Sequence, residues 1–296
     1  MRSLRMLEQV VERIETAEVL DRPAEVVAGP LGRVPRPGPV EDFASGTAIG
    51  HPLHPALVAV PIGAWTAVSY LDLTGADADT ARRLVGLGNV AALPAALTGA
   101  NDWLSTVGAE RRMGFVHATL SYTALTLYGA SWLARRRGRR AAGTALALAG
   151  AGVLSAAGYL GGHLTYAAGV GVDTTVFQQF PTDWVDLASE SDVPADGAIA
   201  HEVNGVPILL ARDSGQVVAL ADRCTHRGGP LHEGKVADGC VTCPWHESVF
   251  QLADGTVVSG PASRPQPVLD ARVVDGRVQV RRGPEPRALR TNPVGH

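Results

Sequence analysis

Two short cysteine–histidine motifs in the last third of the chain constrain its fold most. The first is Cys224-Thr-His226 and the second is Cys243-Pro-Trp-His246, with sixteen residues between His226 and Cys243. Thiolate and imidazole bind zinc as well as iron–sulfur centres. Zinc fingers usually group cysteine with cysteine and histidine with histidine, whereas each motif here carries one of each. The sequence therefore predicts a metal centre formed by two loops, each with one sulfur and one nitrogen ligand.

This arrangement resembles the Rieske [2Fe–2S] family, in which two thiolates hold one iron and two imidazoles hold the other. Residues 228–230, Gly-Gly-Pro, would let the first loop approach a cluster closely, and Pro244 would stiffen the second. The resemblance implies a [2Fe–2S] cluster with these ligands: Cys224 and Cys243 on one iron, His226 and His246 on the other.

The loops are similar to the ferredoxin type of Rieske protein. High-potential members carry an extra cysteine in each loop, joined by a disulfide, but Gly229 and Trp245 stand at those places. Cys240 has no partner left for such a bridge and is expected to be a small buried strand residue. Ser248 could donate a hydrogen bond toward a cluster sulfur and raise the reduction potential. Glu247 stands where the family usually has glycine, and its charge should favour the oxidised cluster.

A membrane part precedes this soluble part. The chain has 296 residues and a net charge of −3, which predicts about two domains and gives no electrostatic case for nucleic-acid binding. Each of four apolar runs is long enough to span a bilayer: Leu53 to Leu73, Leu84 to Leu104, Phe115 to Ala134 and Ala141 to Leu164. The connections are short, so the runs predict a four-helix up-and-down transmembrane bundle; a soluble alanine-rich bundle is the alternative.

The sequence thus predicts a multidomain fold, an all-α transmembrane bundle followed by an all-β Rieske domain. We expect an amphipathic helix from Ser3 to Leu20, on the membrane surface, on a partner or over the soluble domain, and a proline–glycine linker from Gly29 to Pro39. No signal peptide is apparent. The expected segments are: 1–45, N-terminal helix and linker; 46–169, bundle; 170–183, linker; 184–283, Rieske domain; 284–296, tail.

Four histidines and one aspartate are expected at the same membrane face. His51 and His54 open the first apolar helix, His117 opens the third and His163 closes the fourth, while Asp102 lies near the end of the second. Ionisable groups at membrane depth are costly and tend to be functional. Two imidazoles would suit haem b and three with Asp102 a non-haem metal, but a hydrogen-bonded network or a quinone site fits equally.

The helical part also resembles the DUF2231 family of bacterial membrane proteins, over roughly residues 40 to 175. The resemblance rests on these motifs: Gly50-His-Pro-Leu-His-Pro55, Thr98-Gly-Ala-Asn-Asp-Trp103, His117, Gly161-Gly-His-Leu164 and Gly169-Val-Gly-Val-Asp173. The family has no settled function, so it implies topology rather than mechanism.

Strand-like segments separated by turns such as Asn204-Gly205 fill the last part of the chain. They are: Trp184 to Ala188, Ile199 to Val203, Val206 to Ala211, Val217 to Ala221, Cys240 to Cys243, Val249 to Leu252, Val268 to Val274 and Val278 to Arg282. The run Gly260 to Pro267 resembles the proline loop that shields the cluster in Rieske domains. A linker of 14 residues after the fourth helix would place the cluster near the histidine-rich face.

These features together predict a membrane-anchored electron-transfer protein. It would pass single electrons between a redox partner protein and a cofactor or quinone at the histidine-rich face. The alternatives are a redox sensor or assembly module whose bundle is only an anchor, and an enzyme that uses quinol. A ring-hydroxylating oxygenase is not expected, because only about fifty residues follow His246 and its catalytic iron domain would need more.

The expected location is the bacterial cell membrane. Five arginines between residues 135 and 140, with two more at 82–83, favour a cytoplasmic position for the loops opposite the histidines, which leaves the Rieske head outside. The absence of a signal peptide and of a disulfide clamp instead suits a head in the reducing cytosol.

Overall fold

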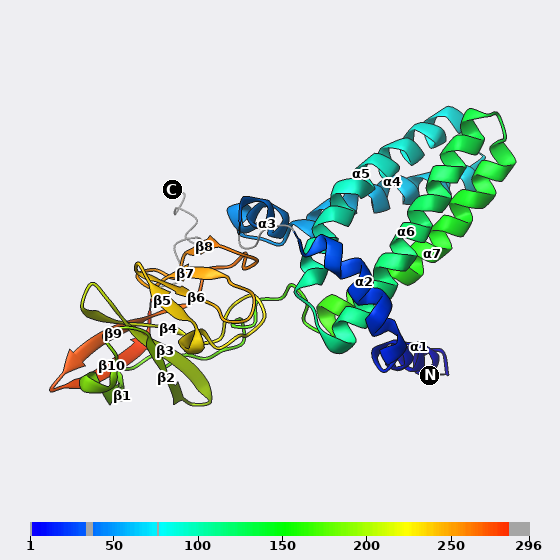
Figure 1. Cartoon of the computed structure of the whole chain (residues 1–296). Helices are drawn as coiled ribbons and strands as arrows, with labels where there is room; N and C mark the ends of the chain where they lie inside the picture. The colour runs from blue at the N-terminus through cyan, green and yellow to red at the C-terminus, as the bar shows by residue number, and fades with distance from the viewer. Residues whose placement is uncertain (1, 34–37, 76, 284–296) are drawn as a thin grey trace. The chain divides into compact units, whose positions relative to one another are not determined.

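The computed structural model describes residues 2–33, 38–75 and 77–283 (Figure 1). The chain divides into two compact units. The helical unit comprises Met1–Val34 and Leu53–Val170, and the β-rich unit comprises Pro35–Pro52 and Gly171–His296. The tail expected at 284–296 lies outside the described residues.

The N-terminal segment forms two helices where one was expected. Helix α1 (Arg2–Glu15) ends five residues earlier than predicted, and the short helix η1 (Glu18–Leu20) leads into α2 (Asp21–Leu31). Part of the expected linker is therefore helical. Its prolines allow this because Pro23 lies in the first turn, where an N–H is not needed, and Pro30 lies in the last.

Part of the apolar face of α1 packs on the helical unit itself. Val11 is buried with Met113 and Leu160, and Ile14 packs against the same cluster, whereas Leu7 is 42% exposed. The Arg112 guanidinium donates to both carboxylate oxygens of Asp21, at 2.6 and 2.7 Å, and to the backbone oxygen of Glu15 at 2.7 Å. This bidentate pair holds the Asp21 pKa below its usual value.

Four long helices follow, and successive helices run antiparallel (Figure 1). They are α4 (Leu53–Thr74), α5 (Ala78–Leu104), α6 (Gly108–Arg136) and α7 (Arg140–Tyr166). Each contains one of the four predicted apolar runs. Closest packing occurs within the α4–α5 and α6–α7 hairpins.

Among the described residues, three helices are long and apolar enough to cross a membrane, namely α4, α5 and α7. The predicted count of four spans is not confirmed, because α6 is less apolar. Several of its hydroxyl groups bond within the helix: Thr119 and Thr123, for example, each donate to the carbonyl oxygen four residues earlier, at 2.8 Å.

An aromatic stack and a buried ion pair link the long helices of the helical unit. The Trp65 and Tyr128 rings are stacked with centroids 4.2 Å apart and planes 4° from parallel. Toward the far end of the helices, Arg135 donates to both carboxylate oxygens of Asp72, and both side chains are at most 2% exposed. Thr144 adds a hydrogen bond to Asp72 at 3.1 Å. The buried pair therefore joins α4, α6 and α7.

Between residues 171 and 283, ten strands form two antiparallel sheets. The six-stranded sheet has the order β1 (Val185–Ser189), β10 (Arg277–Arg282), β9 (Val268–Val274), β4 (Gln216–Ala221), β3 (Val206–Asp213), β2 (Ala198–Val203). The four-stranded sheet has the order β5 (Lys235–Ala237), β6 (Cys240–Thr242), β7 (Val249–Gln251), β8 (Val257–Ser259). Eight of these strands were predicted; β5 and β8 have three residues each, too few for a visible alternation.

A short N-terminal segment belongs to the β-rich unit and not to the helices. It contains α3 (Pro39–Ser45) and the turn η2 (Thr47–Ile49). The Asp42 carboxylate accepts a hydrogen bond from the backbone N–H of Gly260 at 2.7 Å. The Thr47 hydroxyl lies 2.9 Å from the Gly260 oxygen and 3.0 Å from that of Ala262. Residues more than 200 positions apart thus hold the loop after β8.

Candidate metal centre

The first cysteine–histidine loop lies between β4 and β5 and is closed by its own backbone. The Cys224 N–H donates to the Gly229 oxygen at 2.9 Å, and the Gly228 N–H donates to the Cys224 oxygen at 2.8 Å. Gly228 has φ of +74°, a left-handed conformation that glycine adopts without strain. The glycines of this motif therefore make the tight turn possible.

The second loop lies between β6 and β7 and repeats the same hydrogen bonds. The Cys243 N–H donates to the Ser248 oxygen at 2.8 Å, and the Glu247 N–H donates to the Cys243 oxygen at 3.1 Å. Glu247 thus occupies the position that Gly228 has in the first loop, and its φ is +60°. This explains why glycine is expected there, because a side chain strains the left-handed conformation.

The structure brings the four expected ligands together. The Cys224 and Cys243 side chains are buried and close enough to share a hydrogen bond between their sulfurs. The His226 and His246 rings meet edge to face with centroids 5.1 Å apart, and their Nδ1 atoms are buried. Two sulfurs and two imidazoles therefore converge from two loops.

Backbone N–H groups are directed at both sulfurs. A hydrogen bond from Cys224, together with the N–H groups of Trp245 and His246, lowers the pKa of Cys243 to about 7. The same hydrogen bond between the two side chains, together with burial, raises the pKa of Cys224 well above its usual value, although the N–H groups of His226 and Arg227 oppose this. Amides directed at sulfur stabilise thiolates, as metal binding requires.

The space around Gly229 shows how closely the two loops approach each other. A Cβ at this position would lie 2.8 Å from the Cys243 sulfur and 3.0 Å from Cγ of Trp245, both closer than real contacts allow. The first loop can therefore approach the second only because residue 229 has no side chain. Close approach, paired sulfurs and paired imidazoles are what a [2Fe–2S] cluster with two ligands on each iron needs.

Several supporting residues were not identified from the sequence. Gln266 is fully buried; its amide nitrogen donates to the Ala221 and Arg223 oxygens at 2.7 Å each, and its oxygen accepts from the Thr225 N–H at 3.1 Å. It thereby ties the proline loop 260–267 to the first cysteine–histidine loop. In the sequence, Gln266 is distinguished only by its position within the predicted proline loop.

Two further contacts complete the site. The Asp222 carboxylate accepts hydrogen bonds from the backbone N–H of His232 at 2.8 Å and from its ring Nδ1 at 2.9 Å, which closes the base of the first loop. Ser248 is buried, and its Oγ accepts from the Ala262 N–H at 3.0 Å, so its hydroxyl hydrogen is directed elsewhere. Cys240 lies in β6, as expected, but is only half-buried.

Two of the four bundle histidines share one geometry. The Nδ1 atom of His54, on α4, lies 2.8 Å from the Ala95 oxygen on α5. The Nδ1 atom of His117, on α6, lies 2.8 Å from the Ala157 oxygen on α7. Each ring therefore bonds to the partner helix of its own hairpin.

The other expected residues of this face are placed differently. His163, on α7, has its Nε2 atom 3.1 Å from a carboxylate oxygen of Glu15 on α1. His51 is exposed and belongs to the segment that packs with the β-rich unit, not with the helices. Asp102 is half-buried on α5, and its backbone oxygen accepts from Ser105. The four histidines therefore do not form one set within the helical unit.

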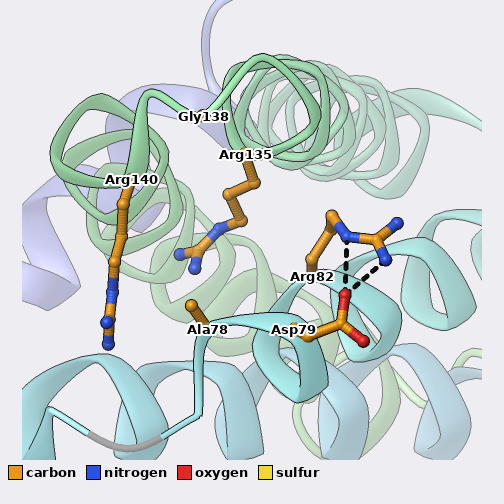
Figure 2. A pocket seen from close by; sticks show the side chains of 6 residues that line it. All are labelled: Ala78, Asp79, Arg82, Arg135, Gly138 and Arg140. Carbon is orange, nitrogen blue, oxygen red and sulfur yellow. Dashed lines mark hydrogen bonds and ion pairs between the residues drawn. The ribbon is translucent and has the colours of Figure 1, made fainter.

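An arginine-lined pocket lies at the opposite end of the helical unit (Figure 2). It is lined by Ala78, Asp79, Arg82, Arg135, Gly138 and Arg140. In Figure 2 Arg82 turns toward Asp79, with which it forms an ion pair. Arg135 follows His117 by 18 residues on α6, about 27 Å along a helix axis, so the pocket is separate from the histidines.

Two family models match the chain. The Rieske [2Fe–2S] domain matches residues 183–275, and the predicted membrane protein family DUF2231 matches residues 50–174. Both resemblances expected from the sequence are thus confirmed, and the Rieske domain implies a [2Fe–2S] cluster. The DUF2231 match covers α4 to α7, so these four helices form the predicted membrane domain of that family.

Two curated relatives each match about a third of this chain or less. The anthranilate 1,2-dioxygenase ferredoxin subunit of Burkholderia cepacia is 33% identical over 101 residues, which are 34% of this chain and 94% of that protein. The toluene-4-sulfonate monooxygenase iron–sulfur subunit TsaM1 of Comamonas testosteroni is 39% identical over 75 residues, 25% of this chain but only 22% of that protein.

Among solved structures, a complex of reduced oxygenase and oxidised ferredoxin in carbazole 1,9a-dioxygenase is 28% identical, with a TM-score of 0.32. That match covers 33% of this chain and 92% of the matched one. The ferredoxin subunit is thus covered almost completely, whereas only 22% of the monooxygenase subunit is covered. The chain belongs to the Rieske [2Fe–2S] family, as a ferredoxin-type electron-transfer domain joined to a DUF2231 membrane domain.

Proposed function

We propose that this protein carries single electrons at a membrane. Its cluster is held by four side chains: Cys224 and Cys243 on one iron, His226 and His246 on the other. The observation that carries this proposal is the pair of matching loops, which brings two sulfurs and two imidazoles together behind Gly229. A bound [2Fe–2S] cluster supplies reversible one-electron chemistry.

The surrounding residues have separable tasks in this account. Backbone N–H groups stabilise negative charge on the two sulfurs. Gln266 and Asp222 hold the first loop, and Ser248 orients the second. Trp245 is 56% exposed beside the second histidine, which suits contact with a redox partner. The relatives named as ferredoxin and iron–sulfur subunits of oxygenase systems support an electron carrier.

The helical unit would hold the carrier at the bacterial cell membrane and supply the second redox site, haem b or a quinone. Of the five residues expected at the histidine-rich face, His54 and His117 are the candidates for that site, because each ring bonds to the partner helix of its own hairpin. The five arginines at 135–140 favour a cytoplasmic position for the α6–α7 loop, and hence a Rieske head on the extracytoplasmic side. Cysteine labelling in intact cells would test this sidedness.

The test of the carrier function uses full-length protein in detergent, reduced with dithionite and mixed in a stopped-flow instrument with a short-chain ubiquinone or a ferric cytochrome c. Rapid, repeatable reoxidation of the cluster is expected. The Cys224→Ser variant should lose both the cluster and the reaction, while Cys240→Ser should keep both. A cluster that exchanges electrons with neither oxidant would contradict the carrier function.

A redox sensor is the second candidate, and one observation favours it. Segments that lead into and out of the helical unit contact the loops of the site. Thr174 donates to the Cys224 oxygen at 2.8 Å, and Asp42 bonds to Gly260, whose backbone lies against Ser248. Cluster state could therefore change these contacts. Proteolysis near residues 35–52 that differs between oxidised and reduced protein, without electron flow to either oxidant, would favour the sensor.

A further inference from the structure

The helical unit is built from two equivalent hairpins. Helix α7 begins and ends 62 positions after α5, and both have 27 residues. Their buried positions also correspond one to one at this spacing. In α5 they are Ala81, Val85, Gly88, Ala95 and Thr98, and in α7 they are Gly143, Ala147, Gly150, Ala157 and Leu160. A correspondence this complete indicates an internal repeat of the α4–α5 hairpin in α6–α7.

Equivalent residues of the two hairpins contact each other. Tyr128 follows Trp65 by 63 positions, and their rings are stacked. Arg135 follows Asp72 by the same 63 positions, and these two side chains form the buried ion pair. A residue that touches its own equivalent lies near a two-fold axis. An approximate two-fold axis therefore passes between α4 and α6.

The histidines His54 and His117 are the third pair with this spacing. Each lies 11 residues before its aromatic residue, which is close to three helical turns, so it lies on the helix face that carries the stack. The two rings are also close enough to interact electrostatically. The two imidazoles thus approach the same axis from opposite sides.

Their immediate surroundings are equivalent as well. The 2.8 Å contacts to the Ala95 and Ala157 oxygens come from Nδ1 in both rings. Glycine follows each alanine by four residues, and a Cβ there would lie 2.7 Å from Cε1 of His54 or 3.0 Å from Cε1 of His117. The bare helix surface at Gly99 and Gly161 therefore fixes where each ring lies.

These contacts determine which nitrogen can bind a ligand. A carbonyl oxygen only accepts, so Nδ1 must carry the hydrogen and donate it. In a neutral imidazole this leaves a lone pair on Nε2. Histidines that bind metals almost always hold the other ring nitrogen in such a hydrogen bond. Two of them related by a two-fold axis present two equivalent lone pairs.

We propose that His54 and His117 bind the iron of one haem as its two axial ligands, through Nε2. The described residues place no third His, Cys, Asp or Glu side chain with His54 and His117 to hold a metal ion, so a bare ion at this pair would be under-coordinated. A haem supplies the remaining four ligands itself and needs only two. His51, His163 and Asp102 have no part in this site.

This inference rests on the proposed function in that it makes the helical unit the second redox centre. The test uses full-length protein purified in detergent from cells supplied with a haem precursor. One haem per chain, sharp α and Soret bands after reduction and a low-spin ferric EPR signal are expected. A haem-free protein that shows the Rieske EPR signal would overturn this inference alone, whereas haem without a Rieske signal would overturn the proposed cluster instead.

Asparagine variants separate ligation from packing, because the asparagine side-chain N–H can replace the Nδ1–H donor but provides no Nε2. His54→Asn and His117→Asn should each abolish the low-spin signal, and the double variant should lower haem content about tenfold or more. His163→Asn and His51→Asn are the matched controls and should leave the low-spin signal and the haem content unchanged. Retention of the low-spin signal in both single variants, or its loss in a control, would overturn the assignment. The assignment would also be overturned if the purified protein contained bound quinone and no haem, and the two histidine variants lost that quinone.

Discussion

The Trp245 ring lies against Gly229 across the two cysteine–histidine loops, at the two positions where a disulfide joins the loops of high-potential Rieske proteins. Any Cβ at residue 229 would meet Cγ of Trp245 at 3.0 Å and the Cys243 sulfur at 2.8 Å. In this chain the loops are therefore held together by close packing and not by a covalent bond.

Gly229→Ala should disrupt the cluster, because the methyl group forces the loops apart. The expected outcome is faster cluster loss, measured as the decay of visible absorbance in the presence of an iron chelator. Gly205→Ala is the matched control for cluster retention, since a Cβ there meets nothing within 4 Å, although its φ of +80° strains the β2–β3 turn. Equal decay rates in the two variants would contradict the packing account.

Glu247 combines a strained backbone with a charge near the cluster, and two variants separate these effects. Glu247→Gly removes both; the left-handed strain of roughly 1–2 kcal/mol is partly offset by the entropy of glycine, roughly 0.5–1 kcal/mol. Glu247→Gln removes only the charge. Both variants should raise the reduction potential, because a negative charge disfavours the reduced cluster.

Only Glu247→Gly should also increase stability, by up to about 1 kcal/mol. An EPR-monitored redox titration and chemical denaturation would measure the two quantities. If Glu247→Gln left the potential unchanged while Glu247→Gly raised it, the charge would not be the cause.

Cys240 is the one cysteine outside the proposed ligand set, and its reactivity should depend steeply on pH. Burial and the carboxylates of Asp238 and Asp213 raise the pKa of its thiol. Because the thiolate is the nucleophile, labelling by a maleimide at pH 7 should be slower than that of a free cysteine and should increase at pH values above the usual thiol pKa of about 8.5.

Asp213→Asn should lower the Cys240 pKa and accelerate labelling near neutral pH. Asp254→Asn, in a different turn, serves as the charge-matched control. The rate would be followed by mass spectrometry, and a wild-type rate equal to that of a free thiol would show that the two carboxylates have no such effect.

The Asp72–Arg135 pair should contribute strongly to the stability of the helical unit. Removing one partner by Asp72→Ala leaves a buried charge uncompensated, which costs about 3–5 kcal/mol. The reversed double variant, Asp72→Arg with Arg135→Asp, should recover part of that loss, because the pair lies near the approximate two-fold axis. The stability of each variant would be measured by unfolding in detergent, monitored by circular dichroism. A double variant that is no more stable than Asp72→Ala would argue against direct pairing.

The sequence was most informative where chemistry fixes the spacing of residues. The motifs around His226 and His246 predicted the Rieske family, the motifs around His54 and His117 predicted the DUF2231 family, and the two family matches confirm both. Contacts between distant residues could not be predicted. Asp42 meets Gly260 across 218 positions, and nothing local distinguishes it from any acidic residue in a helix.

The internal repeat illustrates a different limit. His54 and His117 recur with alanine and glycine at matching distances, but helical core positions are set by size and shape and seldom by identity. Thr98 and Leu160, for example, are equivalent and chemically unlike. Only burial revealed the correspondence, and it separated this pair from His51 and His163.

The most direct measurement of the central claim is low-temperature EPR of dithionite-reduced full-length protein labelled with ¹⁵N-histidine. The account predicts a Rieske-type signal coupled to two histidine nitrogens, unchanged in Cys240→Ser and absent in Cys224→Ser. A protein that shows no such signal and contains one zinc ion at this site would contradict it.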